Sequence, residues 1–346
     1  MVVEVVVMTE ELNDDHDVVV IGGGPAGLNA ALMLARARRS VAVVDAGSPR
    51  NAPAAGVHGM LALDGTPPDE LLERGRAEVR GYGGEVLAGE VVTARRERSG
   101  LAVRLADGRA IRARRLLVTT GLVDELPDVP GLRERWGGDV LHCPYCHGWE
   151  VRDRAIGVLA GGPMSVHQAL LFRQWSADVV LFTHTAGPPT DEEAERLAAR
   201  GVDVVDREVV GVEATEQRLT GVRLVDGTTV AREALAISPR MTARAGFLAD
   251  LGLHPVEHPA GVGQYLPCDE LGRTEVAGVW VAGNVTELSA QVGNAAAAGA
   301  ATAARINAEL VTEETDRAVA AGRSPFSAAD EARNCELVLG NRRHGL

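Results

Sequence analysis

A Cys-Pro-Tyr-Cys sequence occupies residues 143–146, between His142 and His147. Two thiols at this spacing can close into a small disulfide, and closing or opening that disulfide moves two electrons. The spacing also favours the thiolate form, which makes exchange with another thiol possible. An imidazole beside the pair titrates near neutral pH and can take or return a thiol proton. The pattern predicts a redox-active dithiol, with Cys143, Cys146, His142 and His147 as candidate catalytic residues.

Two other interpretations of the cysteine pair are open at this point. Half of a zinc site would need a neighbouring His together with Cys268 or Cys335, but these come from distant segments and the sequence has no second C-x-x-C. Cys-Pro-Tyr-Cys is also the motif of glutaredoxins, although the sequence around it lacks a small thioredoxin-like domain. We therefore expect no metal and favour thiol–disulfide exchange.

The composition limits the classes of function. The 346 residues are 46% hydrophobic, which is enough for two ordinary domains. A net charge of -13 argues against nucleic-acid binding, and 3% aromatic residues leave few stacking platforms for single strands. Four cysteines are too few for a secreted disulfide framework, and we expect neither a signal peptide nor a membrane span. The expectation is a soluble cytoplasmic protein with a disordered leader at residues 1–12.

Residues 22–27 read Gly-Gly-Gly-Pro-Ala-Gly and contain the pattern G-x-G-x-x-G. The apolar run at 17–21 predicts a buried strand, and the apolar spacing at 28–38 predicts a helix. A second strand at 40–45 ends in Asp45. Glycines here allow a close approach of the backbone to a pyrophosphate at the helix N-terminus, and the acid can bind an adenosine ribose. This βαβ unit predicts a dinucleotide site.

The rest of the chain alternates predicted strands and helices. Before the cysteines we expect a helix at 70–81, an antiparallel meander at 85–95, 101–105 and 110–112, and a buried strand at 116–121. After them we expect a second βαβ-type unit, with strands at 155–160, 178–183, 202–205, 221–224 and 234–238 and helices at 165–175 and 191–200. A late strand and turn at 279–284 and a helix at 291–310 complete the pattern.

The order of these motifs resembles that of the low-molecular-weight thioredoxin reductases, which are FAD-dependent disulfide oxidoreductases. Residues 119–121, Thr-Thr-Gly, resemble their Ala-Thr-Gly strand end, and residues 278–284 resemble their second FAD motif, G-V-F-A-A-G-D. The dithiol also lies where that family has it, just before the second nucleotide-binding unit. The resemblance covers about residues 16–312. It implies an α/β fold with two Rossmann-like, three-layer dinucleotide-binding domains, the second inserted in the first.

The implied domain organisation is discontinuous. Residues 13–123 and 247–312 would form the FAD-binding domain, and residues 124–246 the inserted NAD(P)-like domain that carries the Cys-x-x-Cys. Residues 313–346 would be a polar C-terminal tail. The family also implies a homodimer.

The resemblance implies roles for individual residues. Cys146 would be the thiol nearest the flavin, and Cys143 the outer thiol that exchanges with substrate. His147 stands where the family has an acid–base Asp, and His142 is an alternative base. Asn284 replaces the Asp that closes the second FAD motif, so its contact with the cofactor would be that of a neutral side chain. The implied FAD-binding residues are Gly22, Gly24, Pro25, Ala26, Gly27, Asp45, Arg50, Asn51, His58, Thr120, Gly121, Gly283, Asn284, Gln291 and Val292.

The second nucleotide-binding motif departs from the family pattern. In NADPH-using members it reads G-x-G-x-x-A/G, whereas residues 160–165 here read Ala-Gly-Gly-Pro-Met-Ser. Pro163 and Met164 stand where the cofactor would approach. The segment at 183–188, after the next strand, has no Arg pair to bind a 2′-phosphate. The pattern favours FAD as the cofactor and makes NADPH a doubtful partner.

This combination resembles one subgroup of the family, the FAD-dependent dithiol oxidases of gliotoxin and holomycin type. The resemblance implies that a small-molecule dithiol is oxidised to a cyclic disulfide through the cysteine pair and FAD, with O2 reduced to H2O2. Natural-product biosynthesis or self-resistance is the setting it implies. A disulfide reductase fed by NADPH or ferredoxin is one alternative, and a non-catalytic flavin redox sensor is another.

Overall fold

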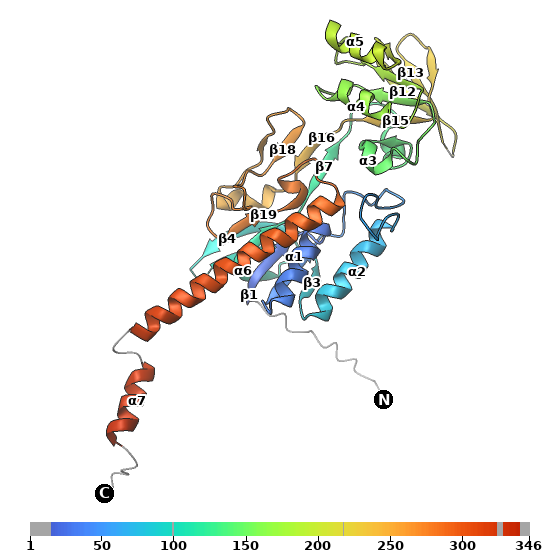
Figure 1. Ribbon diagram of the computed structural model, residues 1–346. Coiled ribbons are helices and arrows are strands. Elements are labelled where there is room, and N and C mark those ends of the chain that lie inside the picture. Colours follow the sequence, from blue (N-terminus) through green and yellow to red (C-terminus); the bar gives the residue numbers. More distant parts are fainter. Residues whose placement is uncertain (1–14, 99, 217, 324–327, 340–346) are drawn as a thin grey trace, which may run out of the picture.

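The computed structural model describes residues 15–98, 100–216, 218–323 and 328–339. The predicted leader at residues 1–12 lies outside these residues. Figure 1 shows two bodies: a larger one that contains the first described strand and much of the last long helix, and a smaller one formed from the middle of the sequence. None of the helices in these ranges is long and apolar enough to cross a membrane.

A seven-stranded sheet forms the centre of the larger body, in the order β3-β2-β1-β6-β5-β4, with β19 also paired to β6. The neighbours β1–β2, β1–β6, β2–β3 and β6–β19 are parallel, and β4, β5 and β6 are antiparallel. The predicted meander is therefore confirmed for β4 to β6, but β3 is a separate parallel strand. The strands are β1 (Asp15–Ile21), β2 (Val41–Asp45), β3 (Glu85–Ala88), β4 (Val91–Glu97), β5 (Gly100–Leu105), β6 (Ala110–Val118) and β19 (Val279–Val281).

The strand β6 is continuous, whereas the sequence predicted two pieces separated by Arg114 and Arg115. Its first residues pair with β5, and its last three, Leu116–Val118, pair with β19. The two arginines do not interrupt it because both form ion pairs with acidic residues of the last long helix. The strand β6 thereby joins segments from the beginning and the end of the sequence.

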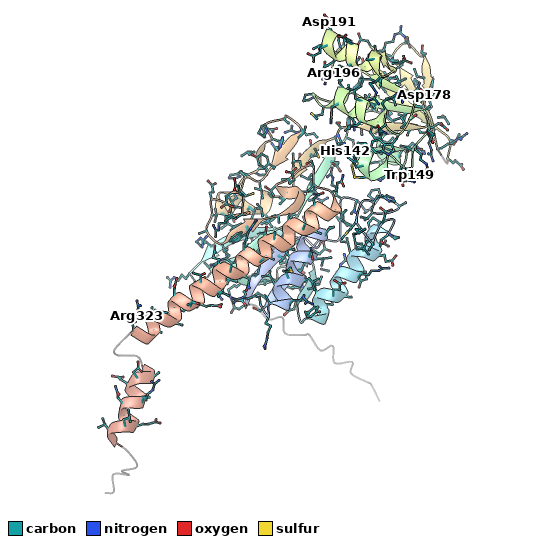
Figure 2. The ribbon with its side chains drawn as sticks, in the orientation of Figure 1. His142, Trp149, Asp178, Asp191, Arg196 and Arg323 are labelled. Atoms are coloured by element: carbon teal, nitrogen blue, oxygen red, sulfur yellow. A yellow bond between two sulfur atoms is a disulfide. The ribbon has the colours of Figure 1, made fainter. Side chains whose placement is uncertain are left out.

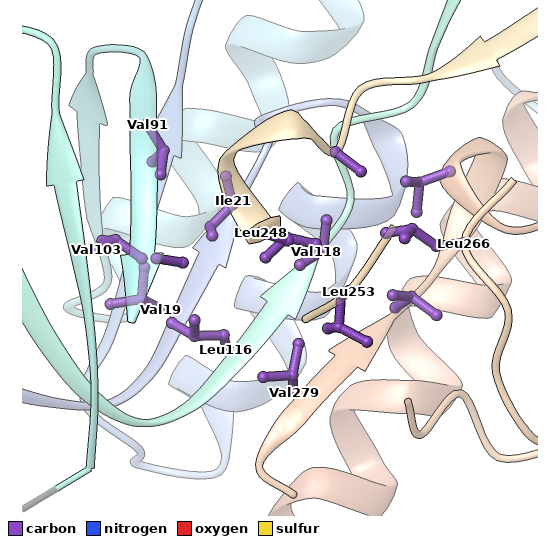
Figure 3. Packing of buried hydrophobic residues seen from close by; sticks show 14 of the residues in the cluster. Val19, Ile21, Val91, Val103, Leu116, Val118, Leu248, Leu253, Leu266 and Val279 are labelled. Atoms are coloured by element: carbon purple, nitrogen blue, oxygen red, sulfur yellow. The ribbon is translucent and has the colours of Figure 1, made fainter. Parts of the chain in front are cut away.

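Three helices cover one face of this sheet: α1 (Pro25–Arg36), α2 (Pro68–Gly81) and α6 (Val292–Arg323). Alternate residues of each strand point to opposite faces, so Val18 and Val20 pack beneath the helices while Val19 and Ile21 face the other side. Figure 3 shows that second cluster, where the strands meet Leu248 of the 3-10 helix η2 (Gly246–Leu251).

The helix α6 is longer than predicted. We expected it to end at residue 310 and a polar tail to follow, but it continues to Arg323, and α7 (Ala328–Leu339) comes after it. Ion pairs explain the continuation: Glu309 pairs with Arg115 at 2.8 Å, and Glu314 pairs with Arg39 at 2.6 Å. These contacts hold the middle of α6 against the edge of the large sheet.

The chain passes between the two bodies along two antiparallel strands, β7 (Leu122–Glu125) and β16 (Arg240–Ala243). They belong to a four-stranded sheet that also contains β18 (Gly263–Tyr265) and β17 (Val256–Glu257). This pair of crossing strands supports our proposed division of the chain near residues 124 and 246.

The smaller body has a five-stranded parallel sheet in the order β11-β10-β9-β15-β8, and a three-stranded antiparallel sheet. The fold is thus the predicted α/β class with two Rossmann-like domains. The strands are β8 (Val140–Leu141), β9 (Ile156–Leu159), β10 (Val179–Phe182), β11 (Val202–Val205), β12 (Val209–Ala214), β13 (Leu219–Leu224), β14 (Thr229–Ala231) and β15 (Ala234–Ile237). The helices are η1 (Arg133–Arg135), α3 (Pro144–His147), α4 (Ser165–Phe172) and α5 (Asp191–Ala199), while η3 (Gly283–Val285) lies in the larger body.

Candidate active site

A cavity of about 1370 Å³ is lined by residues of both bodies. Ligand pockets usually measure about 300–1,000 Å³, so this one has room for a dinucleotide and a second small molecule. Figure 2 shows His142 at the end of the smaller body that faces the larger one. The predicted residues that line the cavity are His142, Cys143, Cys146, His147, Gly22, Gly24, Pro25, Ala26, Asp45, Arg50, Asn51, His58, Thr120, Gly121, Asn284, Gln291 and Val292.

The glycine loop at the start of α1 is shaped for a phosphate. Gly22 has a φ of +109°, and a Cβ there would lie 2.6 Å from the carbonyl oxygen of Thr119. Gly24 is the N-cap residue of α1, and a Cβ on it would meet no described atom within 4 Å, so the space beside it opens into the cavity. Backbone N–H groups at such a helix start bind anions. The loop therefore fits the pyrophosphate of a dinucleotide.

Two of the predicted FAD-binding residues, Gly27 and Gly283, lie outside the cavity lining and allow close packing instead. A Cβ on Gly27 would lie 1.9 Å from the carbonyl oxygen of Gly22. Gly283 has a φ of +77°, and a Cβ on it would lie 2.8 Å from that of Ala26. These glycines bring β19 and the glycine loop against α1.

Asp45 ends β2 and lines the cavity, as the βαβ pattern predicts. Its carboxylate accepts from the N–H of Gly47 at 3.1 Å and pairs with Arg76 at 3.1 Å. The side chain is thereby held at the carboxyl end of the strand, where a ribose would lie in such a fold.

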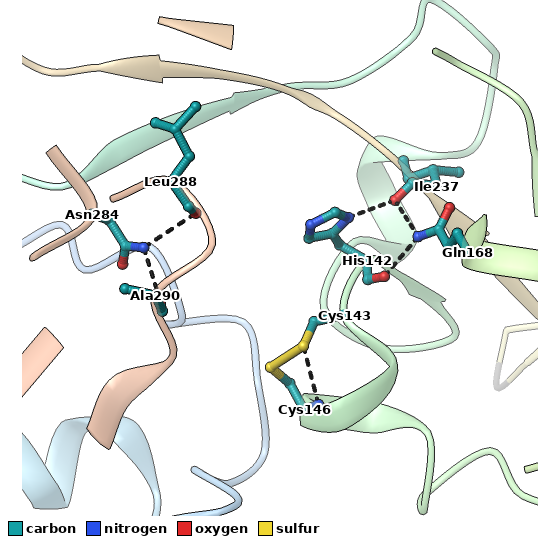
Figure 4. Close-up of a disulfide and its surroundings, with 8 residues drawn as sticks. All are labelled: His142, Cys143, Cys146, Gln168, Ile237, Asn284, Leu288 and Ala290. Carbon is teal, nitrogen blue, oxygen red and sulfur yellow. Dashed lines mark hydrogen bonds between the residues drawn. A yellow bond between two sulfur atoms is a disulfide. The ribbon is translucent and has the colours of Figure 1, made fainter. Parts of the chain in front are cut away.

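Asn284 organises the loop before α6, as Figure 4 shows. Its amide nitrogen lies 2.8 Å from the carbonyl oxygen of Ala290, 3.1 Å from that of Glu287 and 3.3 Å from that of Leu288. An Asp in this place could only accept hydrogen bonds and would repel three carbonyl oxygens. Asn284 thus holds the loop that presents Gln291 and Val292 to the cavity.

The cysteine pair forms a disulfide at the N-terminus of α3 (Figure 4). Cys143 is the N-cap residue, and the N–H of Cys146 donates to its Sγ at 3.2 Å. A backbone N–H donor of this kind stabilises a thiolate on the sulfur that accepts it. The geometry thus favours the thiolate form at Cys143.

His142 is fixed by a hydrogen bond to the end of β15. Its Nδ1 lies 3.0 Å from the carbonyl oxygen of Ile237, and because a carbonyl only accepts, Nδ1 carries the proton and Nε2 has a free lone pair. Gln168 donates to the carbonyl oxygen of His142 at 2.8 Å and holds the turn in place. Burial lowers the pKa of His142, partly opposed by the bond to Ile237. The ring is neutral at pH 7 and able to accept a proton.

The side chain of His147 is half-buried, and its ring nitrogens have no hydrogen-bond partner among the described residues. Both ring nitrogens are shielded from solvent, and neither contacts a donor or acceptor among the described residues. Burial lowers the pKa of His147, while the charge of Glu150 raises it. An unpaired neutral imidazole that lines a cavity is an uncommon arrangement, because buried polar groups are usually satisfied. An imidazole without a partner can take a hydrogen bond or a proton from a group that reaches it.

His58 joins the two bodies on this side of the cavity. Its Nδ1 lies 3.4 Å from a carboxylate oxygen of Asp64 in its own loop, and its Nε2 lies 3.5 Å from a carboxylate oxygen of Glu150 in the smaller body. Arg50, from the same side of the large sheet, pairs through two nitrogens with Asp124 of β7. Both side chains line the cavity, but their polar ends are engaged by protein carboxylates.

A profile of the pyridine nucleotide-disulphide oxidoreductases matches residues 16–300. The chain belongs to this family. The thioredoxin reductase tcpT of Claviceps purpurea is 30% identical over 294 residues, which are 82% of this chain and 90% of that protein. FAD is the cofactor of the family and of this chain, and the glycine loop at residues 22–27 is shaped for its pyrophosphate.

Two solved structures are closely similar to this disulphide oxidoreductase. The structure of HlmI is 49% identical with a TM-score of 0.82, and the match covers 89% of this chain and 96% of that one. An oxidoreductase from Agrobacterium tumefaciens is 34% identical with a TM-score of 0.81, over 86% and 99% of the two chains. The predicted resemblance to thioredoxin reductase-like flavoproteins is thereby confirmed, and the protein is an FAD-dependent thiol/disulfide oxidoreductase.

The loop at residues 160–165, which corresponds to the family's second nucleotide-binding motif, forms hydrogen bonds within itself. The hydroxyl oxygen of Ser165 accepts from the N–H groups of Gly161 at 3.1 Å and Gly162 at 3.2 Å, and donates to the carbonyl oxygen of Gly162 at 2.7 Å. Those N–H groups are the donors that such a loop would offer to a phosphate. Ser165 is buried, so a pyrophosphate would have to displace its hydroxyl. Ser165 thereby occupies the phosphate donors of this loop.

Several residues of the site were missed in the sequence. Asp124 and Glu150 pair with Arg50 and His58 across long sequence separations, and single-sequence patterns carry no signal for such pairs. Ser165 could have been found, because a Ser three residues after Gly162 is a common backbone cap. Within the described residues, no group of three or more His, Cys, Asp or Glu side chains could hold a metal.

Proposed function

We propose that this oxidoreductase is a dithiol oxidase, which converts a small-molecule dithiol to an intramolecular disulfide. The observation that carries the proposal is the combination of a closed Cys143–Cys146 disulfide on the wall of the FAD cavity with a pyridine nucleotide loop capped by Ser165. The oxidised pair can accept electrons from a dithiol. The capped loop supports a reaction that proceeds without a nicotinamide donor.

The first exchange begins with a substrate thiol that gives its proton to His147 or His142. The thiolate attacks Sγ of Cys143, the bond between the two cysteines breaks, and Cys146 takes up a proton as a thiol. A mixed disulfide now joins the substrate to Cys143. Both imidazoles are neutral at pH 7 and line the same cavity as the disulfide, which supports their role as the bases.

The second exchange releases the product. The remaining substrate thiol is deprotonated and attacks the substrate sulfur of the mixed disulfide, so the substrate closes on itself and Cys143 leaves as a thiolate. The N–H of Cys146 stabilises that leaving anion. The substrate has lost two electrons and two protons. The cysteine pair holds both electrons and one proton, as the Cys143 thiolate and the Cys146 thiol, and the second proton is on the histidine that served as the base.

When bound, FAD supplies the two-electron acceptor that reoxidises the cysteine pair and the route to dioxygen. The net reaction is R(SH)2 + O2 → RS2 + H2O2. An oxygen electrode tests it: a dithiol should drive oxygen uptake without NADPH, with one H2O2 for each disulfide formed. Oxygen uptake that requires NADPH would contradict the proposal.

A disulfide reductase is the second candidate, because a relative 30% identical to this chain is named a thioredoxin reductase. It would draw electrons from NADPH or a donor such as ferredoxin. Anaerobic addition of NADPH separates the two: bleaching of the flavin absorbance supports the reductase, and bleaching by a dithiol alone supports the oxidase.

The family resemblance also leads us to propose a cytoplasmic homodimer that acts in natural-product biosynthesis or self-resistance. The mass of the purified protein in solution tests the dimer.

A further inference from the structure

Tyr145 stands between the two cysteines, with most of its side chain uncovered. It lies on α3, lines the FAD cavity and is 61% exposed. Among the described residues, Tyr145 is the exposed Tyr, Trp or Phe that lines this cavity. We propose that Tyr145 is a positioning residue that selects flat, conjugated dithiols over saturated ones; this inference rests on the proposed oxidase function.

The ring of Tyr145 is supported from behind. It meets the ring of Trp175 edge-on, with centroids 5.7 Å apart and planes at 85°. Trp175 in turn packs on Phe172, which is completely buried in the smaller body. Gly148 makes this approach possible, because a Cβ there would lie 2.8 Å from the Trp175 ring. The rings of Tyr145, Trp175 and Phe172 thus form a continuous packed row from the dithiol turn to the core of the smaller body.

A ring held in this way is suited to recognition. Tyr has few rotatable bonds and is already ordered by Trp175, so covering its free face costs little conformational entropy. A flat conjugated substrate can stack on that face with its two sulfurs towards the neighbouring cysteines. A saturated dithiol carries hydrogens above and below its carbon frame and cannot stack in this manner.

The charges around the dithiol favour the same conclusion. The charges that act most strongly on His142 are those of Arg50 and Asp124, and these two neutralise each other. The carboxylate of Glu150, which acts on His147, lies against His58. The charges that act on the two histidines are thus engaged by protein groups, which leaves the aromatic face of Tyr145 as a recognition surface for a neutral substrate.

The test compares two probes that can each close an intramolecular disulfide, the flat naphthalene-1,8-dithiol and the saturated dithiothreitol, by oxygen uptake with the FAD-loaded enzyme. For Tyr145→Ala we expect the ratio of kcat/KM values, naphthalene-1,8-dithiol over dithiothreitol, to fall about 3- to 10-fold, since a ring–ring contact has that magnitude. The change should lie in KM rather than kcat. Tyr145→Phe keeps the ring and should restore the wild-type ratio.

Trp149→Ala is the matched control. Trp149 is also exposed, at 64%, but it stacks on Arg152 and is outside the cavity lining. Its variant should keep the wild-type ratio, and the flavin spectrum of each variant verifies folding. An unchanged ratio in Tyr145→Ala, or an equal change with both probes, overturns the role of Tyr145 while leaving the oxidase intact. If the wild-type enzyme oxidises neither probe, the proposed function fails and this inference fails with it.

Discussion

The guanidinium of Arg50 binds the carboxylate of Asp124 through two hydrogen bonds, of 2.8 and 2.7 Å. Arg50 belongs to the loop after β2, and Asp124 lies on β7, one of the two strands that lead to the smaller body. The Asp124 side chain is only 7% exposed. The pair thus fixes the cavity wall to the crossing between the bodies.

Replacing Asp124 with Asn should destabilise the folded protein. The change leaves a partly buried guanidinium without its anionic partner, and we expect a loss of about 1–3 kcal/mol in the free energy of unfolding. Urea unfolding of the FAD-loaded protein measures it. Glu97→Gln is the control, because Glu97 pairs with Arg95 on an exposed strand and should matter by less than about 0.5 kcal/mol. Equal losses in both variants would disprove a special role for the Arg50–Asp124 pair.

The two cysteines should differ in their reaction with an aromatic disulfide. In a background with Cys268 and Cys335 changed to Ser, the variant Cys146→Ser retains the proposed exchanging thiol, and Cys143→Ser lacks it. We expect Cys146→Ser to release thionitrobenzoate from 5,5′-dithiobis(2-nitrobenzoate) on the order of tenfold faster, because only Cys143 accepts a backbone hydrogen bond as a thiolate. Both variants should keep the flavin absorbance and lose dithiol turnover. Faster release by Cys143→Ser would reverse the assigned roles.

Stability should fall as the solution becomes acidic. Burial lowers the pKa of both His142 and His147 in the folded protein, so below about pH 6.5 the unfolded chain binds protons that the folded one does not. The stabilisation is fully present above pH 6.5 and is lost as pH falls towards the folded pKa values. Urea midpoints at pH 7.5 and 5.5 measure the change, which should be smaller in His147→Gln than in wild type. His167→Gln, at an exposed position of α4, should behave like wild type.

The ion pairs of Glu314 should stabilise the long helix against the sheet. Hydrogen bonds from Arg39 and Arg114 lower the pKa of Glu314 to about 2. The contribution is therefore present above pH 4.5 and lost as pH falls from 4.5 towards 2. Glu314→Gln should lower the thermal unfolding midpoint at neutral pH, and less so in high salt, which screens the exposed charges. The same decrease at both salt concentrations would point to packing rather than charge.

Much of the fold could be predicted because local patterns and tertiary packing agree. The strand–glycine–helix unit at residues 17–38 and the dithiol turn carry their signals within a few residues. The elements that were predicted wrongly depend on partners far away in the sequence. Arg114 and Arg115 suggested a break in β6, but acidic residues about 200 positions later pair with their charges, so the strand continues. The length of α6 was underestimated for the same reason. Its second half is polar and suggested a tail, but its acidic residues pair with arginines of the large sheet and its loops.

The shared strand β6 has a consequence for biosynthesis. Its last residues pair with β19, so the sheet of the larger domain lacks a buried strand until about residue 281 has left the ribosome. The smaller domain, whose sheets lie between residues 140 and 237, is by then complete. Because domains fold as units during synthesis, the turn that carries Cys143 and Cys146 should be ordered before the FAD-binding domain is complete.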